Sequence, residues 1–188
     1  AFEYSEKYGT PVFLRPTTRV CHGYASIMVK DETEYTHHQP EGFIKDSKRW
    51  VIFPRLSFMN HKKIEARNQE LSDVFSSYEK NKIHPSCDAF KDSKKGIATG
   101  GISYTYTMET LKKTGMVKTL KIATPHPFPE KLAVDFLSGL DEVLCLEELD
   151  PVIERELIYI CGKYHLPTRI NGKLSGHTAC AGENTRDT

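Results

Sequence analysis

Apolar residues in the second half of the chain alternate between short runs and helical stripes. The runs are typical of buried strands, which are expected at residues 97–99, 117–123, 143–146 and 168–170. Helices are expected between these strands, at residues 102–114, after Pro129 and after Asp150-Pro151. Strands that alternate with helices predict a mostly parallel sheet covered by helical layers. The expected fold class is therefore α/β, with a three-layer α/β/α domain over residues 94–175.

The first part of the chain does not show this alternation. Residues 1–8 indicate a helix that stops at Gly9. Two short runs have strand character, at residues 12–14 and 50–53. One helix end and one strand cannot close a core, so Phe13 and Leu14 need a dry surface from elsewhere. We expect the 94–175 domain or a second copy of the chain to supply that surface, and we expect the chain to be a fragment.

A charge-rich helix is expected near residues 57–80. Its apolar stripe is narrow, which is typical of a helix that lies on a surface. The stripe consists of Leu71, Val74, Phe75 and Tyr78. These patterns divide the chain into residues 1–30, a connecting segment 31–93, the domain 94–175 and a tail 176–188.

Charge and cysteine usage exclude several classes of protein. The 188 residues include 26 Lys and Arg against 25 Asp and Glu, and both signs are interspersed, so no nucleic-acid partner is expected. No apolar run approaches the roughly 20 residues that span a bilayer, so no membrane partner is expected. The five cysteines are widely spaced and form no C-x-x-C pair. They favour free thiols in a cytoplasmic setting, and no metal site is expected.

Two groups of residues follow predicted strands, where open α/β sheets bind ligands. Gly100-Gly101 are candidates for cofactor binding, because backbone N–H groups in such turns can contact phosphate. The simpler interpretation is a tight turn, since the G-x-G-x-x-G pattern is incomplete. Glu147, Glu148 and Asp150 offer carboxylates for acid–base work or metal binding. Structural roles are the simpler interpretation here too, with Asp150 as the cap of the following helix.

The remaining candidates concern substrate binding. Arg15, Thr17, Thr18 and Arg19 combine guanidinium and hydroxyl groups suited to a carboxylate or phosphate, and a solvated turn is the alternative. His126 lies in a proline-bounded loop after a strand, but no nucleophile or carboxylate is tied to it by sequence. No catalytic residue is assigned. Three other histidines lack a metal-binding spacing: His37, His38 and His177.

Several stretches of the chain carry a resemblance to a known family. They read AFEYSEKYGTPVFLRPTTRVCH (1–22), GIATGGISYTYTMETLKKTG (96–115), LKIATPHPFPEKL (120–132), DEVLCLEELDPVIERE (141–156) and NGKLSGHTACAGENT (171–185). In this order they resemble the alpha subunit of indolepyruvate:ferredoxin oxidoreductase, a thiamine pyrophosphate-dependent 2-oxoacid:ferredoxin oxidoreductase. The resemblance implies a transketolase C-terminal-like domain over residues 94–175 and a remnant of a pyrimidine-binding domain over residues 1–30.

The resemblance also implies what the parent enzyme does. It would decarboxylate arylpyruvates oxidatively to aryl-acetyl-CoA in the cytoplasm, with thiamine pyrophosphate, Mg, iron–sulfur clusters and CoA as co-substrate. Its partners would be a beta subunit, a second alpha copy and the electron acceptor ferredoxin. The chain lacks the family's Gly-Asp-Gly motif and its ferredoxin-like cysteine clusters. No cofactor is therefore expected on this fragment, which would have a structural role in subunit assembly and be inert alone.

Two alternatives stay open at the level of sequence. One is a nucleotide- or CoA-binding α/β module without catalytic activity, based on Gly100-Gly101. The other is a freestanding interaction protein. A homodimer of the fragment also stays open as an assembly.

Overall fold

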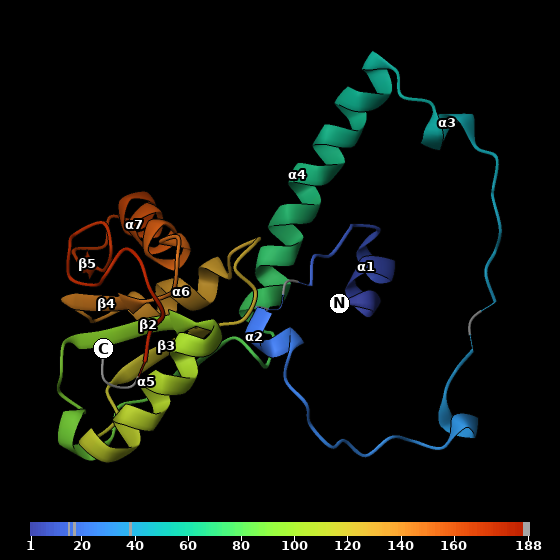
Figure 1. The fold of residues 1–188 in the computed structure, drawn as a ribbon. Helices are drawn as coiled ribbons and strands as arrows, with labels where there is room; N and C mark the ends of the chain where they lie inside the picture. Colours follow the sequence, from blue (N-terminus) through green and yellow to red (C-terminus); the bar gives the residue numbers. More distant parts are fainter. Residues whose placement is uncertain (15, 17, 38, 186–188) are drawn as a thin grey trace. The chain divides into compact units, whose positions relative to one another are not determined.

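Five strands between residues 82 and 171 form one sheet in the computed structural model, which describes residues 1–14, 16, 18–37 and 39–185 (Figure 1). The strands lie in the order β1-β3-β2-β4-β5. Their bounds are β1 Lys82–His84, β2 Lys95–Gly100, β3 Lys118–Ile122, β4 Glu142–Leu146 and β5 Arg169–Asn171. β1 runs antiparallel to β3, and the other three pairs are parallel. The sheet is therefore mostly parallel, as the alternation of strands and helices predicts.

Helices cover both faces of this sheet. α5 (Gly101–Thr114) lies on one face, and α6 (Glu130–Leu137) and α7 (Val152–Tyr164) lie on the other (Figure 1). Two glycines of β2 face α6 and α7 at close range. A Cβ atom added at Gly96 would lie 2.9 Å from Cζ of Phe136, and one added at Gly100 would lie 3.2 Å from Cδ1 of Ile153. The three-layer α/β/α prediction is confirmed.

The main core lies between the sheet and the α6–α7 layer. Its fully buried side chains include Leu120, Phe136, Val143, Leu157 and Ile160. Burying one such side chain contributes about 1.5–3 kcal/mol to folding, so this layer is the main source of stability.

The inward face of α5 is lined mainly by small side chains. Tyr104 and Met108 are only half-buried. The buried positions are Ser103, Thr107 and Leu111. The Thr107 hydroxyl donates to the carbonyl oxygen of Ser103 at 2.7 Å, so its polar atom is satisfied within the helix. Two small side chains thus line the face that α5 turns to the sheet.

The chain forms two units, Ala1–Lys63 and Ile64–Thr188, and the boundary falls within α4 (Pro54–Ser76). The first unit also contains α1 (Phe2–Tyr8), α2 (Thr18–Cys21), the 3-10 helix η1 (Glu32–Glu34) and α3 (Ser47–Trp50). α1 ends at Gly9 in the left-handed conformation (φ 56°), as predicted. None of the described side chains in this unit is buried.

Both strands predicted in the first unit are wrong. Residues 12–14 belong to no helix or strand. Residues 51–53 likewise belong to no helix or strand. Trp50 is instead the last residue of α3, which is capped by the Asp46 carboxylate through a hydrogen bond from the Lys48 N–H at 2.9 Å. An isolated apolar run has no strand to pair with here.

The predicted helix at residues 57–80 exists as α4, but it begins at Pro54 and ends at Ser76. After it, the chain turns and enters β1, which the sequence does not predict. Buried Asn81 fixes this turn. Its amide Nδ2 donates to the Phe75 carbonyl oxygen at 2.9 Å, and its Oδ1 accepts from the Ala123 N–H at 2.7 Å. The sheet therefore begins upstream of residue 94.

Two further segments complete the second unit. The 3-10 helix η2 (Asp88–Phe90) links β1 to β2, and the chain continues beyond β5 as residues 172–185. No helix within the described ranges has both the length and the apolar character needed to cross a bilayer.

Candidate functional site

The connections of neighbouring strands diverge at the carboxyl edge of the parallel sheet. β2 pairs with β3 on one side and with β4 on the other. β2 continues directly into α5 on one face, and the loop after β4 leads to α7 on the opposite face. Open α/β sheets bind ligands at such a reversal. The structure thus brings Gly100-Gly101 next to the loop that carries Glu147 and Glu148, because Thr99 pairs with Leu146.

Both glycines have conformational reasons to be glycine. Gly101 has φ 57°, a left-handed conformation that side chains other than glycine rarely adopt. A Cβ atom at Gly100 would lie 2.7 Å from the Ile122 carbonyl oxygen. These contacts explain the pair as a tight turn into α5, and cofactor binding by it stays a prediction.

Glu147 caps α7, a role that the sequence wrongly assigns to Asp150. Its two carboxylate oxygens accept hydrogen bonds from the N–H groups of Ile153 at 2.9 Å and Glu154 at 3.0 Å. The side chain of Asp150 makes no capping contact. Burial raises the pKa of Glu147, and the backbone hydrogen bonds only partly oppose this effect. Glu147 is therefore a structural group rather than an exposed acid or base.

Residues 172–185, which we call the strap, cross the same carboxyl edge. The backbone N–H of Asn184 donates to Oε1 of Glu148 at 2.9 Å, and its Nδ2 donates to Oγ of Ser103 at 2.8 Å. Ser103 lies in the first turn of α5, and its side chain is buried, with 3% of the residue exposed. The strap thus connects the α5 N-terminus to the loop after β4, and the chain itself covers this part of the carboxyl edge.

The start of the strap is fixed by a buried carboxylate of α7. Glu154 is 1% exposed, and both of its oxygens accept from the N–H of Leu174, at 3.2 and 3.1 Å. A Cβ atom at Gly172 would lie 2.6 Å from Oε2 of Glu154, so only glycine fits beside this carboxylate. The Lys173 ammonium, also buried, donates to the carbonyl oxygen of Ala179. A buried carboxylate held in this way anchors the strap to the domain.

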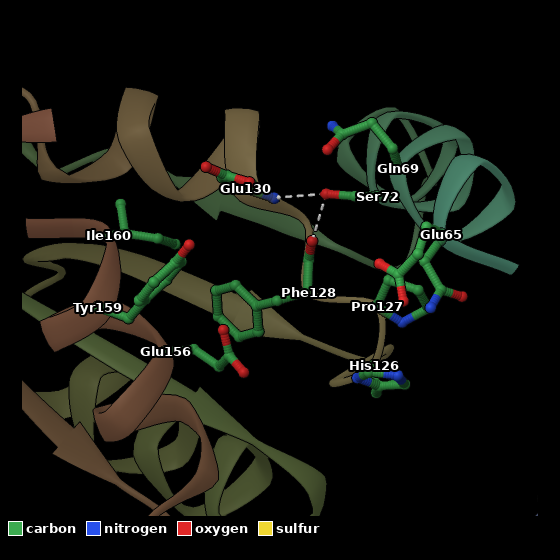
Figure 2. A pocket seen from close by; sticks show the side chains of 11 residues that line it. Glu65, Gln69, Ser72, His126, Pro127, Phe128, Glu130, Glu156, Tyr159 and Ile160 are labelled. Carbon is green, nitrogen blue, oxygen red and sulfur yellow. Dashed lines mark hydrogen bonds between the residues drawn. The ribbon is translucent and has the colours of Figure 1, made fainter. Parts of the chain in front are cut away.

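A pocket lies between α4, the loop that follows the carboxyl end of β3, and α7 (Figure 2). It has a volume of about 330 Å³. Its lining residues are Glu65, Asn68, Gln69, Ser72, His126, Pro127, Phe128, Glu130, Glu156, Tyr159 and Ile160. The Ser72 hydroxyl donates to the Phe128 carbonyl oxygen at 2.6 Å and accepts from the Glu130 N–H at 3.4 Å. These two hydrogen bonds join α4 to the loop and form one wall of the pocket.

The pocket carries an acidic surface. Lys163 contacts Glu130, with Nζ 2.5 Å from Oε1. Burial opposes ionisation of Glu130, but hydrogen bonds from Lys163 and Tyr164 outweigh burial and lower its pKa. Burial raises the pKa of Glu156, and the positive charge of His126 opposes this rise. The predicted residue His126 thus lies beside a carboxylate that the sequence does not link to it.

The other residues predicted from sequence are not found at the Gly100–Glu148 edge of the sheet or in the pocket of Figure 2. Thr18 is exposed at the start of the short helix α2. Arg15, Thr17 and the side chain of Arg19 lie outside what the structure describes, as does His38. His37 is exposed, and His177 lies in the strap with Nδ1 2.9 Å from the Ser175 hydroxyl. Across the described residues, no three His, Cys, Asp or Glu side chains are grouped to hold a metal ion.

One polar contact was missed by sequence reasoning. Nε2 of His84 in β1 lies 3.0 Å from the Tyr104 hydroxyl in α5. Burial and the nearby charges of Lys82 and Lys121 lower the pKa of His84, which favours its neutral form. The missing signal is β1 itself, since the contact depends on a strand that the sequence does not predict.

Comparison with known proteins finds relatives that are several times longer than this chain. No family model matches the chain. It is 36% identical over 178 residues to the indolepyruvate oxidoreductase subunit IorA of Methanothermobacter thermautotrophicus, covering 94% of the chain and 28% of that relative. It is 34% identical over 178 residues to the subunit IorA of Pyrococcus abyssi, covering 92% of the chain and 27% of that relative.

A further subunit IorA, from Thermococcus kodakarensis, is 35% identical over 166 residues, which cover 84% of the chain and 24% of that relative. The chain therefore spans between a quarter and a third of the length of the curated relatives first described. Because the similarity covers almost the whole chain in each case, this protein belongs to the family of indolepyruvate oxidoreductase IorA subunits.

Proposed function

We propose that this chain is a structural and assembly region of an indolepyruvate:ferredoxin oxidoreductase alpha subunit, and that it is inert alone. The parent enzyme would convert arylpyruvates to aryl-acetyl-CoA in the cytoplasm and pass electrons to ferredoxin. Thiamine pyrophosphate, Mg and iron–sulfur clusters would be bound by other parts of that enzyme. Its assembly would contain a beta subunit and a second alpha copy.

One observation carries the proposal of a structural role. The carboxyl edge of the sheet, where a domain of this class would bind a ligand, is occupied by the strap through Asn184, Glu148 and Ser103. Glu147, the most buried carboxylate of the loop after β4, is already engaged by two N–H groups of α7. The groups best placed for chemistry are thus committed to holding the domain together.

The alternative of a nucleotide- or CoA-binding module depends on Gly100-Gly101 and finds less support. A phosphate at the first turn of α5 would compete with Asn184 for Ser103. Calorimetry with CoA and with adenine nucleotides distinguishes the two proposals, since only a binding module releases heat at millimolar ligand.

Inertness is tested by the purified 188-residue chain. We expect no arylpyruvate-dependent reduction of a viologen dye when thiamine pyrophosphate, Mg and CoA are supplied. The complete two-subunit enzyme serves as the positive control. Turnover by the chain alone would contradict the proposal.

The assembly role is tested in the complete enzyme with a core substitution, Leu157→Ala, at a fully buried position of α7. We expect fewer assembled complexes in size-exclusion chromatography, and an unchanged kcat per assembled complex. The exposed position Ile158 beside it supplies the control, Ile158→Ala, which should leave assembly unchanged. A reduced kcat with normal assembly for Leu157→Ala would indicate a direct part in catalysis.

A further inference from the structure

A row of polar side chains crosses three strands on the face of the sheet that α5 covers. Lys82 of β1 pairs with Lys121 of β3, and Lys121 pairs with Thr99 of β2. Residues that pair directly project from the same face of a sheet. Lys121 identifies this face, because its Nζ lies 4.5 Å from the ring centroid of Tyr104 in α5. We call Lys82, Lys121 and Thr99 the lysine row.

The lysine row contains hydrogen-bond donors without acceptors. A lysine ammonium only donates, and a threonine hydroxyl also carries a donor. The Thr99 hydroxyl is fully buried and has no hydrogen-bond partner among the described residues. Over the same part of the chain, neither lysine of the row forms an ion pair with a carboxylate. Other lysines of the second unit do form such pairs, namely Lys80, Lys95, Lys113, Lys131 and Lys163.

The two lysines oppose each other in an arrangement that is unfavourable for the chain itself. Like charges directly opposite in an antiparallel pair destabilise a sheet, whereas opposite charges stabilise it. A lysine on an edge strand can protect the edge from pairing, and this role accounts for Lys82 in β1. It does not account for Lys121, because β3 lies between β1 and β2. A positive charge at this inner position therefore needs another explanation.

Tyr104 and His84 hold the positive charge in place. The Tyr104 hydroxyl lies 3.0 Å from Nε2 of His84, and its ring lies under the Lys121 ammonium. Burial and the charges of both lysines lower the pKa of His84, so both ammonium groups act on the same ring. Lys82 is exposed and Lys121 is half-buried, and β1 pairs only with β3 within the described sheet. The row can therefore be reached from the β1 side.

These features limit the kind of partner. Neighbouring ammonium groups beside an edge strand suit carboxylates on an extended chain, since alternate side chains of such a chain project from one side. A nucleic acid fits less well, because it selects a broad basic surface and the net charge of the chain is only +1.

We propose that the lysine row docks an acidic, extended segment of a partner protein, whose neighbouring carboxylates contact Lys82 and Lys121. This inference rests on the proposed role in assembly and adds the chemistry of one contact. It concerns exposed and half-buried side chains outside the main core, so the row can be altered without removing core packing.

The first test is a titration of the 188-residue chain with the peptide acetyl-Gly-Glu-Gly-Glu-Gly-amide, followed by amide chemical shifts in NMR at low salt. We expect saturable shifts at residues 82–84 and 119–121, with affinity in the millimolar range that exposed ion pairs provide. The matched peptide with Gln in place of Glu should not saturate. Equal responses to the two peptides, shifts located elsewhere, or equal binding of a thymidine oligonucleotide of the same charge would overturn the proposal.

Matched variants locate the charge effect. Lys121→Gln should weaken binding of the acidic peptide about fivefold, in the upper range for an exposed ion pair. Lys131→Gln makes the same change in an exposed lysine that pairs with Asp73, and it should bind as the unmodified chain does. Equal affinities for the two variants would contradict the assigned role of Lys121. Lys82→Gln changes an exposed side chain and supplies the same test if Lys121→Gln does not fold.

The complete two-subunit enzyme separates this inference from the assembly role itself. Lys82→Gln should lower the salt concentration at which the complex dissociates in size-exclusion chromatography, because it removes one screened ion pair. Lys131→Gln should leave that concentration unchanged. Dissociation of the Lys82→Gln enzyme at the same salt concentration as the unmodified enzyme would overturn the docking inference. The assembly role would still be judged by Leu157→Ala, whose effect does not depend on the lysine row.

Discussion

The two units of this chain differ in what they do with their apolar side chains. In residues 64–185, Phe136, Leu157 and Val143 are fully buried between the sheet and its helices. In residues 1–63, Phe13 is 91% exposed and Phe43 is 84% exposed. Both units contain aromatic and branched residues, so composition does not account for the difference. The second unit alternates strands and helices that can cover one another, whereas the first has no second layer of its own.

This difference shows which unit of the chain can bury its apolar side chains by itself. A side chain gains stability only when some surface removes it from water. The first unit carries such side chains without that surface. Packing of Phe13 and Leu14 against another surface, in this chain or in a second copy, therefore stays a prediction.

The largest test of the comparison replaces one phenylalanine in each unit. Phe136→Ala removes a fully buried ring and should lower the free energy of unfolding by about 3–5 kcal/mol. Phe13→Ala removes an exposed ring and should change it by no more than about 0.5 kcal/mol. Urea unfolding followed by circular dichroism measures both. Equal losses for the two variants would mean that residues 1–63 share a core with the rest of the chain.

A smaller effect is expected from the cap of α7. Glu147→Ala leaves two N–H groups without their acceptor and should cost about 1–3 kcal/mol of unfolding free energy. Asp150→Ala is the matched control, because Asp150 is exposed and makes no capping contact, and it should be close to neutral. The same urea experiment ranks the two variants, and a larger loss for Asp150→Ala would restore the cap assigned from sequence.

The strap provides a third test within the packed unit. Asn184→Ala removes the side-chain hydrogen bond to Ser103 and should lower stability by about 0.5–1.5 kcal/mol. Because the strap covers the α5 N-terminus, amide hydrogen exchange should accelerate at residues 102–104, while exchange in α6 stays unchanged. Unaltered exchange at these residues would show that the strap does not protect the carboxyl edge.

The pH dependence of stability gives the most subtle test. Burial raises the pKa of Glu147 above that of the unfolded chain, so the folded state retains this proton to higher pH. The stabilisation that comes from the raised pKa is fully present below pH about 4.5 and is lost as the pH rises through the folded pKa. We expect wild-type protein to lose stability relative to Glu147→Gln between pH 4.5 and neutrality, measured by urea unfolding at several pH values. A difference that stays constant, or that grows in favour of wild type, would contradict the assigned cause.

The sequence predicts four strands of the sheet and misses β1. β2, β3, β4 and β5 each coincide with a predicted strand, and β4 is the continuous apolar run that is typical of a buried parallel strand. β1 contains only Ile83 between Lys82 and His84, and it is held by backbone pairing with β3 at the edge of the sheet. β5, at the other edge, also contains a single apolar residue, Ile170, so apolar content alone does not separate β1 from the strands that the sequence predicts. The run at residues 12–14 is apolar but forms no strand, since it has no strand to pair with.

The site residues likewise divide into those that a local sequence pattern indicates and those that depend on tertiary contacts. The acidic loop after β4 was identified from sequence, but the capping carboxylate depends on the turn at Leu149, whose φ of 58° belongs to the left-handed region. The pocket depends on Ser72 meeting Phe128, residues 56 positions apart, and no local pattern indicates that contact. Sequence therefore places single residues at strand ends, and tertiary contacts decide which of them act together.

Native-state hydrogen exchange at low protein concentration tests most directly the claim that residues 64–185 form a self-sufficient α/β body. The amides of Ala98, Leu120 and Val143, in three adjacent strands, should exchange only through global unfolding, with the free energy that urea unfolding gives. Amides of α1 and α3 should exchange nearly as fast as those of an unstructured peptide. Sheet amides that exchange far below the global free energy, or α1 amides protected as strongly as the sheet, would contradict the claim.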